Sequence, residues 1–184
     1  GAPFWGPPGT PPPPKPTAWA QSVNPDTLVL QAGFLASAYY IGHPLSAVPD
    51  LPLLRPSATA RVGAIDFMKK GSFRARFGRW PGQHVAAAWA GLIRVREEGV
   101  YTFYVTASQG AHVWVDGWMV VDNGGVHALT TAHGEADLGV GYHYFKADWF
   151  SDEPGGRIKI MYSGPDTLNQ LVLLPGFSQV LQGG

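Results

Sequence analysis

Hydrophobic and polar residues alternate with a period of two along much of this chain, most clearly between Trp89 and Asp122. Tyr101, Phe103 and Val105 there occupy every second position. Alternating β-branched and aromatic residues, bounded by glycines, are typical of antiparallel strands joined by tight turns. A helix through this stretch would hold several interior glycines, each costing about 1 kcal/mol relative to alanine. The pattern therefore predicts consecutive β-strands.

Turn signals within this stretch, and strand-like runs on both sides of it, agree with this prediction. The pairs Glu98-Gly99 and Asp116-Gly117 suit hairpin turns, which need residues that tolerate positive φ. The loop 42–57, with its four prolines, should be ordered and tuck Leu51, Leu53 and Leu54 inward. Together these signals predict an all-β, antiparallel fold. Further strands are expected at residues 27–31, 34–40, 62–67, 126–132, 134–138, 142–150, 157–162 and 171–174.

The order of these motifs resembles the PA14 domain family. The family-like pattern W-x-G, G-x-Y-x-F, W-V-D-G and V-V-D is carried by residues 89–91, 99–103, 114–117 and 120–122, and the similarity continues into residues 134–150 and 157–165. The resemblance covers roughly residues 28–177. It implies a β-sandwich, usually an extracellular module used for glycan binding or for assembly and adhesion.

One position departs from the family. The resemblance implies that glycan-binding members of the family carry two adjacent aspartates, which ligate Ca²⁺, just before the glycine equivalent to Gly110. This chain has Ser108 and Gln109 there. Calcium prefers around 6–8 hard oxygens, preferably charged ones. We therefore expect no calcium and no other cofactor, and we interpret Ser108 and Gln109 as a polar hairpin tip.

Composition adds little chemistry. The 184 residues include no cysteine, so disulfides and thiolate chemistry are excluded, and Lys plus Arg balance Asp plus Glu at 13 each. Such a neutral chain has no overall field to recruit nucleic acid, and it favours association between molecules. No apolar run reaches the ~18 residues of a membrane span. The chain begins with Gly1 and shows no signal peptide, so we expect a processed protein or a fragment.

Residues 1–25 differ from the rest and are predicted to form an extended arm preceding a globular domain at 26–184. They hold nine of the 17 prolines, and a proline run favours polyproline II. Exposed aromatic residues on such an arm are unusual, so we expect a neighbouring copy or its own domain to cover them. Proline runs are also similar to those of O-glycosylated cell-wall proteins. The predicted assembly contacts are Phe4, Trp5, Pro11, Pro12, Pro13, Pro14 and Trp19.

The segment 67–80 mixes cations with aromatic residues and carries a charge of +5, leaving 8 basic against 13 acidic residues elsewhere. It could contact another protein or copy, stack on sugars, or bind single-stranded nucleic acid, the least favoured of the three. It could equally be a solvated loop whose aromatic residues pack on the sandwich. Its cations are Lys69, Lys70, Arg74, Arg76 and Arg79.

Catalytic motifs are absent from the sequence: no G-x-S-x-G, H-E-x-x-H, Walker or Rossmann pattern occurs. His127 and His133 fit no standard metal spacing. Four aspartates could converge at one end of a sandwich, as the carboxylate pair of a glycosidase requires. Two of them, Asp116 and Asp122, are explained as turn-forming residues. We therefore expect that this protein is not an enzyme. These aspartates are Asp116, Asp122, Asp148 and Asp152.

Three functions remain open. The first is a structural subunit of an extracellular fibre, surface layer or cell wall, a homo-oligomer or homopolymer in which the arm of one copy packs on the next. The second is a calcium-independent glycan-binding module or adhesin. The third is an accessory domain of a larger secreted enzyme. The candidate glycan contacts are Gln109, Trp118, Asp122, Asn123 and Trp80.

Overall fold

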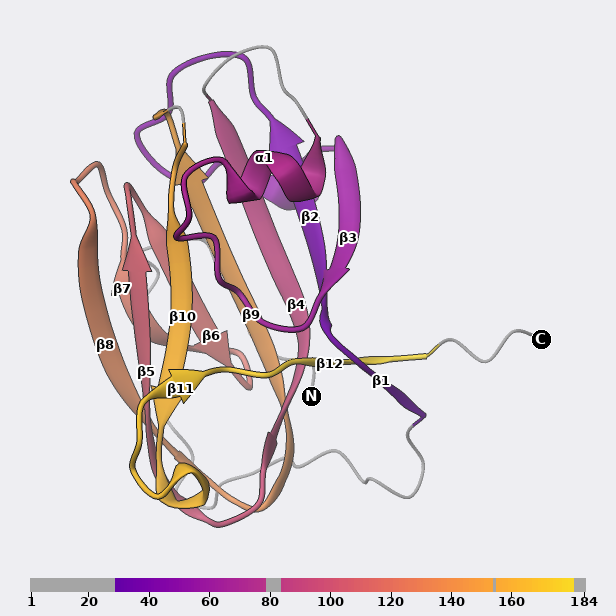
Figure 1. Ribbon diagram of the computed structural model, residues 1–184, viewed down its shortest axis with the longest axis vertical. Coiled ribbons are helices and arrows are strands. Elements are labelled where there is room, and N and C mark those ends of the chain that lie inside the picture. The colour runs from indigo at the N-terminus through magenta and orange to yellow at the C-terminus, as the bar shows by residue number, and fades with distance from the viewer. Residues whose placement is uncertain (1–28, 79–83, 154, 181–184) are drawn as a thin grey trace.

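The computed structural model describes residues 29–78, 84–153 and 155–180, and these form two antiparallel β-sheets packed face to face (Figure 1). The larger sheet has eight strands, with β1-β12-β4-β9-β6-β7 in order across it, while β2 pairs with β4 and β3 pairs with β2. The smaller sheet has the order β11-β10-β5-β8. The strands are β1 (Leu30–Ala32), β2 (Phe34–Tyr40), β3 (Ala58–Val62), β4 (Val85–Val95), β5 (Gly99–Ala107), β6 (Ala111–Val115), β7 (Trp118–Asn123), β8 (Thr130–Leu138), β9 (Gly141–Ser151), β10 (Ile158–Ser163), β11 (Val172–Leu173) and β12 (Phe177–Gln179). In the described part of the chain, the helical elements are α1 (Ser72–Phe77) and the 3₁₀ turns η2 (Leu51–Leu53) and η3 (Pro165–Thr167).

The core lies between the sheets and is built from the alternating positions. Trp89 and Trp149 of the large sheet and Phe103 and Ile160 of the small sheet are fully buried there. Inward side chains at a period of two are what a half-buried strand requires. The predicted all-β sandwich is therefore confirmed. The arm at residues 1–25 lies outside the described residues, so it stays a prediction.

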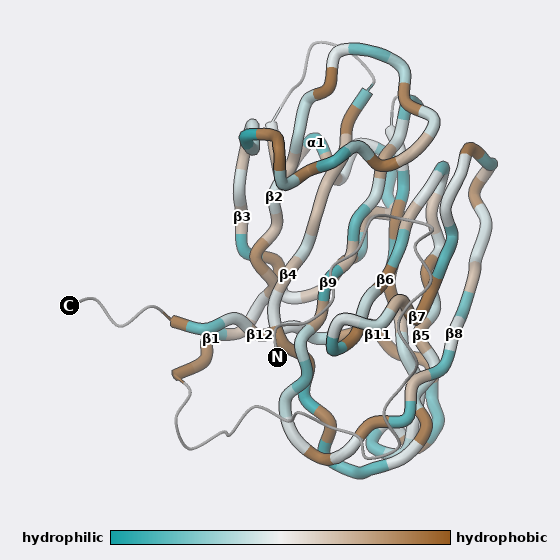
Figure 2. The backbone as a smooth tube through the Cα atoms, turned by 180° about the vertical axis from the view of Figure 1, so that it is seen from behind, coloured by the Kyte–Doolittle hydropathy of each residue, from teal (hydrophilic) through white to brown (hydrophobic). Residues whose placement is uncertain are grey.

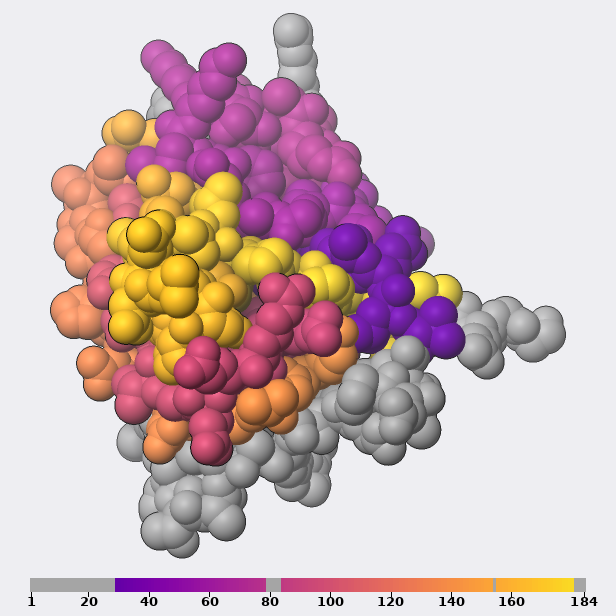
Figure 3. All heavy atoms as spheres, turned by 60° about the horizontal axis from the view of Figure 1, so that its bottom comes forward, coloured from indigo at the N-terminus to yellow at the C-terminus, as the bar shows by residue number. Residues whose placement is uncertain are grey.

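The two ends of the described chain meet in the large sheet. β12 pairs with β1 and with β4, so residues near both ends lie side by side (Figure 3). Gly91 of β4 allows this arrangement, because a Cβ at this position would overlap the carbonyl oxygen of Phe177. Strand β12 was not expected from the sequence, and the expected closing strand at 171–174 is reduced to the two exposed residues of β11.

The expected strand at 62–67 is wrong. The strand β3 ends at Val62, where the expected one begins. Ile65 and Phe67 are nevertheless buried, because they pack in the core and this part of the chain exchanges main-chain hydrogen bonds with β10. These two residues are hydrophobic because they pack in the core, although they do not belong to a continuous strand.

Two strands were expected at 126–132 and 134–138, but residues 130–138 form one strand, β8, and residues 126–129 belong to the loop before it. Gly134 lies within β8 and does not interrupt it. The carbonyl oxygen of Val120 on β7 occupies the space that a Cβ at position 134 would need. This glycine therefore marks a close approach of two backbones.

The loop between β2 and β3 crosses the outer face of the large sheet (Figure 2). Val48 and Leu51 pack there against Phe150 and Tyr39. The expected inward placement is correct for Leu51 but wrong for its neighbours, since Leu53 is 80% exposed and Leu54 is also exposed. On β9 this loop covers Phe150 on the outer face, while Trp149 on the other face lies in the core between the sheets.

Candidate functional site

The turn between β5 and β6 holds Ser108 and Gln109, and both are buried. The Ser108 hydroxyl accepts the Arg157 N–H at 2.8 Å, while the Gln109 side-chain oxygen accepts the Asp152 N–H at 3.3 Å. Gln109 has φ of 64°, and its N–H donates to the carbonyl of His127 at 3.0 Å. The turn is polar as expected, but it is not a hairpin tip, because β5 and β6 lie in different sheets. The turn is a junction between three loops, and its polar atoms are used within the protein.

This geometry does not fit calcium at the position where the family carries its metal ligands. Ser108 and Gln109 supply two neutral oxygens, and both already accept a main-chain N–H. Asp152, the nearest carboxylate by hydrogen bonding, receives the Leu45 N–H at 2.9 and 3.0 Å and contacts His84 at 2.8 Å. Among the described residues, no group of three or more His, Cys, Asp or Glu side chains could hold a metal ion.

The predicted glycan contacts are not brought together as an open site. Asn123 is buried, and its amide donates to the carbonyls of Val105 and Thr130 at 3.1 and 3.0 Å. Trp118 begins β7 while Asn123 ends it, and the Trp118 side chain is only 9% exposed. The Asp122 side chain is exposed. Trp80 lies outside the described residues.

In the segment 67–80, residues 72–77 form a short helix, α1, where one interpretation was a solvated loop whose aromatic residues pack on the sandwich. Phe73 and Phe77 of α1 are buried and pack with Phe67 against the core. Arg76 donates to the carbonyl of Arg61 at 2.8 Å. Lys69 and Lys70 are exposed, and Arg79 lies outside the described residues.

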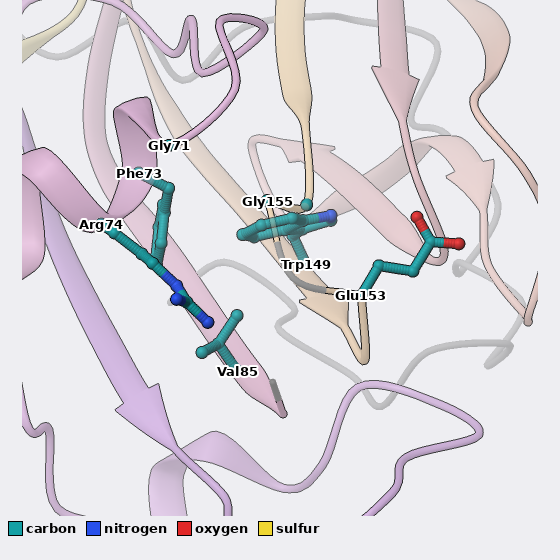
Figure 4. A pocket seen from close by; sticks show the side chains of 8 residues that line it. Gly71, Phe73, Arg74, Val85, Trp149, Glu153 and Gly155 are labelled. Atoms are coloured by element: carbon teal, nitrogen blue, oxygen red, sulfur yellow. The ribbon is translucent and has the colours of Figure 1, made fainter. Parts of the chain in front are cut away.

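A small hollow lies between α1 and the end of β9. Figure 4 shows Phe73 and Arg74 on one side of it, with Trp149 and Glu153 on the other and the Glu153 carboxylate pointing away from Arg74. Its volume of about 10 Å³ leaves room for about one water molecule. Arg74 therefore does not line a ligand-sized cavity at this hollow.

The four aspartates considered for catalysis each lie beside a histidine. Asp116 contacts His143 at 2.6 Å, and Asp152 contacts His84 at 2.8 Å. Asp148 and Asp122 approach opposite ring nitrogens of His112 at 2.7 and 3.4 Å. Burial raises the pKa of the Asp148 carboxyl, although the His112 hydrogen bond and charge act to lower it. These pairs connect neighbouring strands and loops, and sequence spacing gave no sign of them.

The two histidines close in sequence have local partners. The ring nitrogens of His127 lie 2.9 Å from the Asn123 carbonyl and 2.7 Å from the Ala128 carbonyl. His133 stacks on Tyr104, with ring centroids 5.6 Å apart. Each of these two rings therefore has contacts of its own within the protein.

An open groove of about 860 Å³ crosses the outer face of the large sheet, beside the loop between β2 and β3. Its floor and walls include the apolar side chains of Leu35, Ala90 and Leu92 and the aromatic ring of Tyr144, which is 39% exposed. Polar side chains border it from β1, β3, β9 and β12. They belong to Gln31, Arg61, Lys146, Ser178 and Gln179.

This groove was not expected from the sequence. The alternation along β2, β4 and β9 identifies the outward positions, but only the register of three strands shows that they share one patch. The signal that could have been used was the presence of Tyr144 on the face of β9 opposite the core residues.

The fold is similar to several solved structures. The PA14 domain of the antifreeze protein MpAFP aligns with a TM-score of 0.69 and 19% identity over 88% of this chain and 96% of that one. A PA14 sugar-binding domain from an RTX adhesin aligns with a TM-score of 0.66 and 17% identity, over 78% of this chain and 94% of that one. An anti-sigma factor domain-containing protein from Clostridium clariflavum gives 0.63 and 20%, with 79% of this chain covering 46% of that one. The chain thus spans about half the length of that protein.

Comparison with curated protein sequences gives no match. No helix among the described residues is long and apolar enough to cross a membrane. The model of the PA14 domain family matches residues 31–172, which is most of the chain. Together with the two-sheet architecture, this match shows that the chain belongs to the PA14 domain family.

Proposed function

We propose that this chain is an extracellular, non-catalytic recognition module of the adhesion type, which binds glycans through its outer groove and without calcium. The observation that carries this proposal is the placement of Tyr144, a partly exposed aromatic ring over an apolar floor bordered by hydrogen-bonding side chains. Ligand sites commonly combine an apolar surface with a few polar groups that fix orientation. The C–H faces of sugars pack on such rings, while hydroxyl groups bind the polar border.

Two further observations support a carbohydrate ligand. One of the solved structures with this fold is described as a sugar-binding domain from an adhesin. The turn that carries the family's calcium ligands is closed here by the bonds of Ser108 and Gln109. A glycan-binding function in this chain therefore needs another surface, and the groove offers one. The predicted contacts at Asp122 and Asn123 stay a prediction.

A glycan array, read with calcium and with a chelator, tests this function. We expect binding that is unchanged by the chelator and is lost in the Tyr144→Ala variant. Tyr104→Ala is the matched control, because Tyr104 lies on β5, on the opposite sheet. Chelator-sensitive binding, or equal loss in both variants, would contradict a calcium-independent site at the groove.

A second candidate function is assembly into an extracellular fibre or surface layer. It is favoured by the position of β1, which among the described strands pairs with β12 alone and so has a second edge available to another strand. The predicted arm joins the domain at this edge, beside the groove that Gln31 helps to line. An arm from a neighbouring copy could add main-chain hydrogen bonds along the edge and place Phe4, Trp5 or Trp19 in the groove.

Sedimentation of the full chain and of a variant lacking residues 1–19 tests assembly. We expect the full chain to form homo-oligomers and the shortened chain to remain a folded monomer. Equal sedimentation of the two proteins would remove the arm from the assembly mechanism while leaving the glycan proposal intact.

A further inference from the structure

The charged side chains that border the groove are of one sign. Arg61 and Lys146 contribute two cations, and none of the described residues that line the groove is Asp or Glu. The chain as a whole is neutral, with 13 basic and 13 acidic residues. The one-sided charge of this border is therefore a local property of the groove.

Strand register places these cations at two ends of one row. Leu35 of β2 pairs with Arg61 of β3 and with Ala90 of β4, and Ala90 pairs with Lys146 of β9. Neighbouring strands lie about 4.8 Å apart, so the main chains at the two cations are separated by roughly 14 Å. The apolar side chains of Leu35 and Ala90 lie between them. A single small anion suits this spacing poorly, whereas a chain molecule with repeated negative charges suits it well.

Both cationic side chains are held in position. The Arg61 guanidinium donates to the Ser178 hydroxyl, which donates to the Gly33 carbonyl at 2.8 Å. The Lys146 ammonium lies over the Trp114 ring, 4.7 Å from its centroid. Burial lowers the pKa of Lys146, while the charges of Asp148 and Asp50 act to raise it. A partly buried ammonium gains more from an added anion than a fully hydrated one does.

Resting on the proposed glycan function, we infer that the groove recognises an acidic glycan, a polysaccharide with repeated carboxylate or sulfate groups. Sugar rings pack on Tyr144 and along the floor between Leu35 and Leu92. Anionic groups at separate positions along the glycan bind Arg61 and Lys146. Asp50, on the loop beside the groove, opposes this binding through its charge near Lys146.

Isothermal titration with oligogalacturonate, with its carboxyl-reduced neutral counterpart and with polyglutamate of similar length tests the inference. We expect the acidic oligosaccharide to bind best. Arg61→Gln and Lys146→Gln should each weaken it about tenfold, because each removes a close charge–charge contact. Arg61→Lys should retain most of the binding, and Asp50→Asn should strengthen it. Asp50 caps no helix turn with its side chain, so this change should leave the fold intact.

Lys159→Gln is the charge-matched control, since Lys159 lies on β10 of the other sheet. Thermal unfolding of every variant separates loss of binding from loss of folding. Equal binding of acidic and neutral oligosaccharides, still dependent on Tyr144, would overturn the inference and leave the proposed function standing. Binding of neither oligosaccharide would remove both. If polyglutamate binds as tightly as the acidic oligosaccharide, the ligand is an acidic polypeptide and the inference of an acidic glycan is overturned.

Discussion

Gln109 and Asp152 are joined by a hydrogen bond in which the Gln109 side-chain oxygen accepts the Asp152 main-chain N–H at 3.3 Å. The Asp152 carboxylate in turn binds the Leu45 N–H and the ring of His84. The β5–β6 turn is thereby connected to the end of β9, the start of β4 and the loop beside the groove. The turn that ligates calcium in the family's glycan-binding members serves as a structural junction here.

Calcium should accordingly have no effect on the stability of this protein. We expect the same Tm in calcium and in chelator, because Ser108 and Gln109 offer two neutral oxygens that are already bonded. Gln109→Ala should lower the free energy of unfolding by about 1–2 kcal/mol, since the Asp152 N–H loses its partner. Differential scanning calorimetry measures both effects. A rise in Tm with calcium would show that the turn opens to bind the ion.

Gly134 should be intolerant of any side chain. A Cβ there would overlap the Val120 carbonyl, so Gly134→Ala must push β7 away from β8. We expect a loss of about 1–3 kcal/mol or more, as for other overpacked sites. Gly63→Ala is the control, since no atom lies within 4 Å of a Cβ at that position. Urea unfolding of both variants provides the test, and equal stabilities would contradict the close approach.

The core was predictable because its signal is local. Tyr101, Phe103 and Val105 alternate along the sequence, and a period of two directly specifies which side chains face inward. The Asp116-Gly117 turn was predictable for the same reason, and both residues have the positive φ that it requires. Strand β12 was not, because its three residues carry no alternation that distinguishes them from a loop.

The groove and the β5–β6 turn were less predictable because they depend on residues that are distant in the sequence. Arg61 and Lys146 are 85 positions apart in the sequence, yet three strand pairings place them in one row. Gln109 is a polar residue of a type that is usually exposed in turns. It is buried because loops from other parts of the chain pack around it. The departure from the family's aspartates was visible in the sequence, but the bonds that replace the metal were not.

The aromatic residues of the 67–80 segment should matter for stability more than its cations. Phe73 is buried against Trp149 at a ring distance of 5.1 Å, whereas Lys69 and Lys70 are exposed. We expect Phe73→Ala to cost about 3–5 kcal/mol, as for other buried phenylalanines. Lys69→Gln with Lys70→Gln should change stability by less than about 0.5 kcal/mol. Chemical denaturation measures both, and a large effect of the lysine changes would show that their charges support the fold.

His143 should make stability depend on pH near neutrality. Its ring nitrogens lie 2.6 Å from the Asp116 carboxylate and 2.7 Å from the Gly139 carbonyl, so both are placed to donate. Burial acts to lower the pKa of His143, but the Asp116 hydrogen bond and charge, together with the Gly139 carbonyl, outweigh it and raise the pKa above 6.5. The folded state therefore holds this proton more tightly than the unfolded state does.

The resulting stabilisation is complete below pH 6.5 and is lost as pH rises through the raised pKa of the folded state. We expect the free energy of unfolding of the wild type to fall over this range relative to that of His143→Gln. Asp116→Asn is the matched control, because asparagine tolerates the positive φ at this position while removing the charge that holds the proton. Its pH dependence above 6.5 should be weaker than that of the wild type. Urea unfolding at a series of pH values measures the difference, and parallel curves for the wild type and His143→Gln would show that this imidazole is neutral in the folded protein.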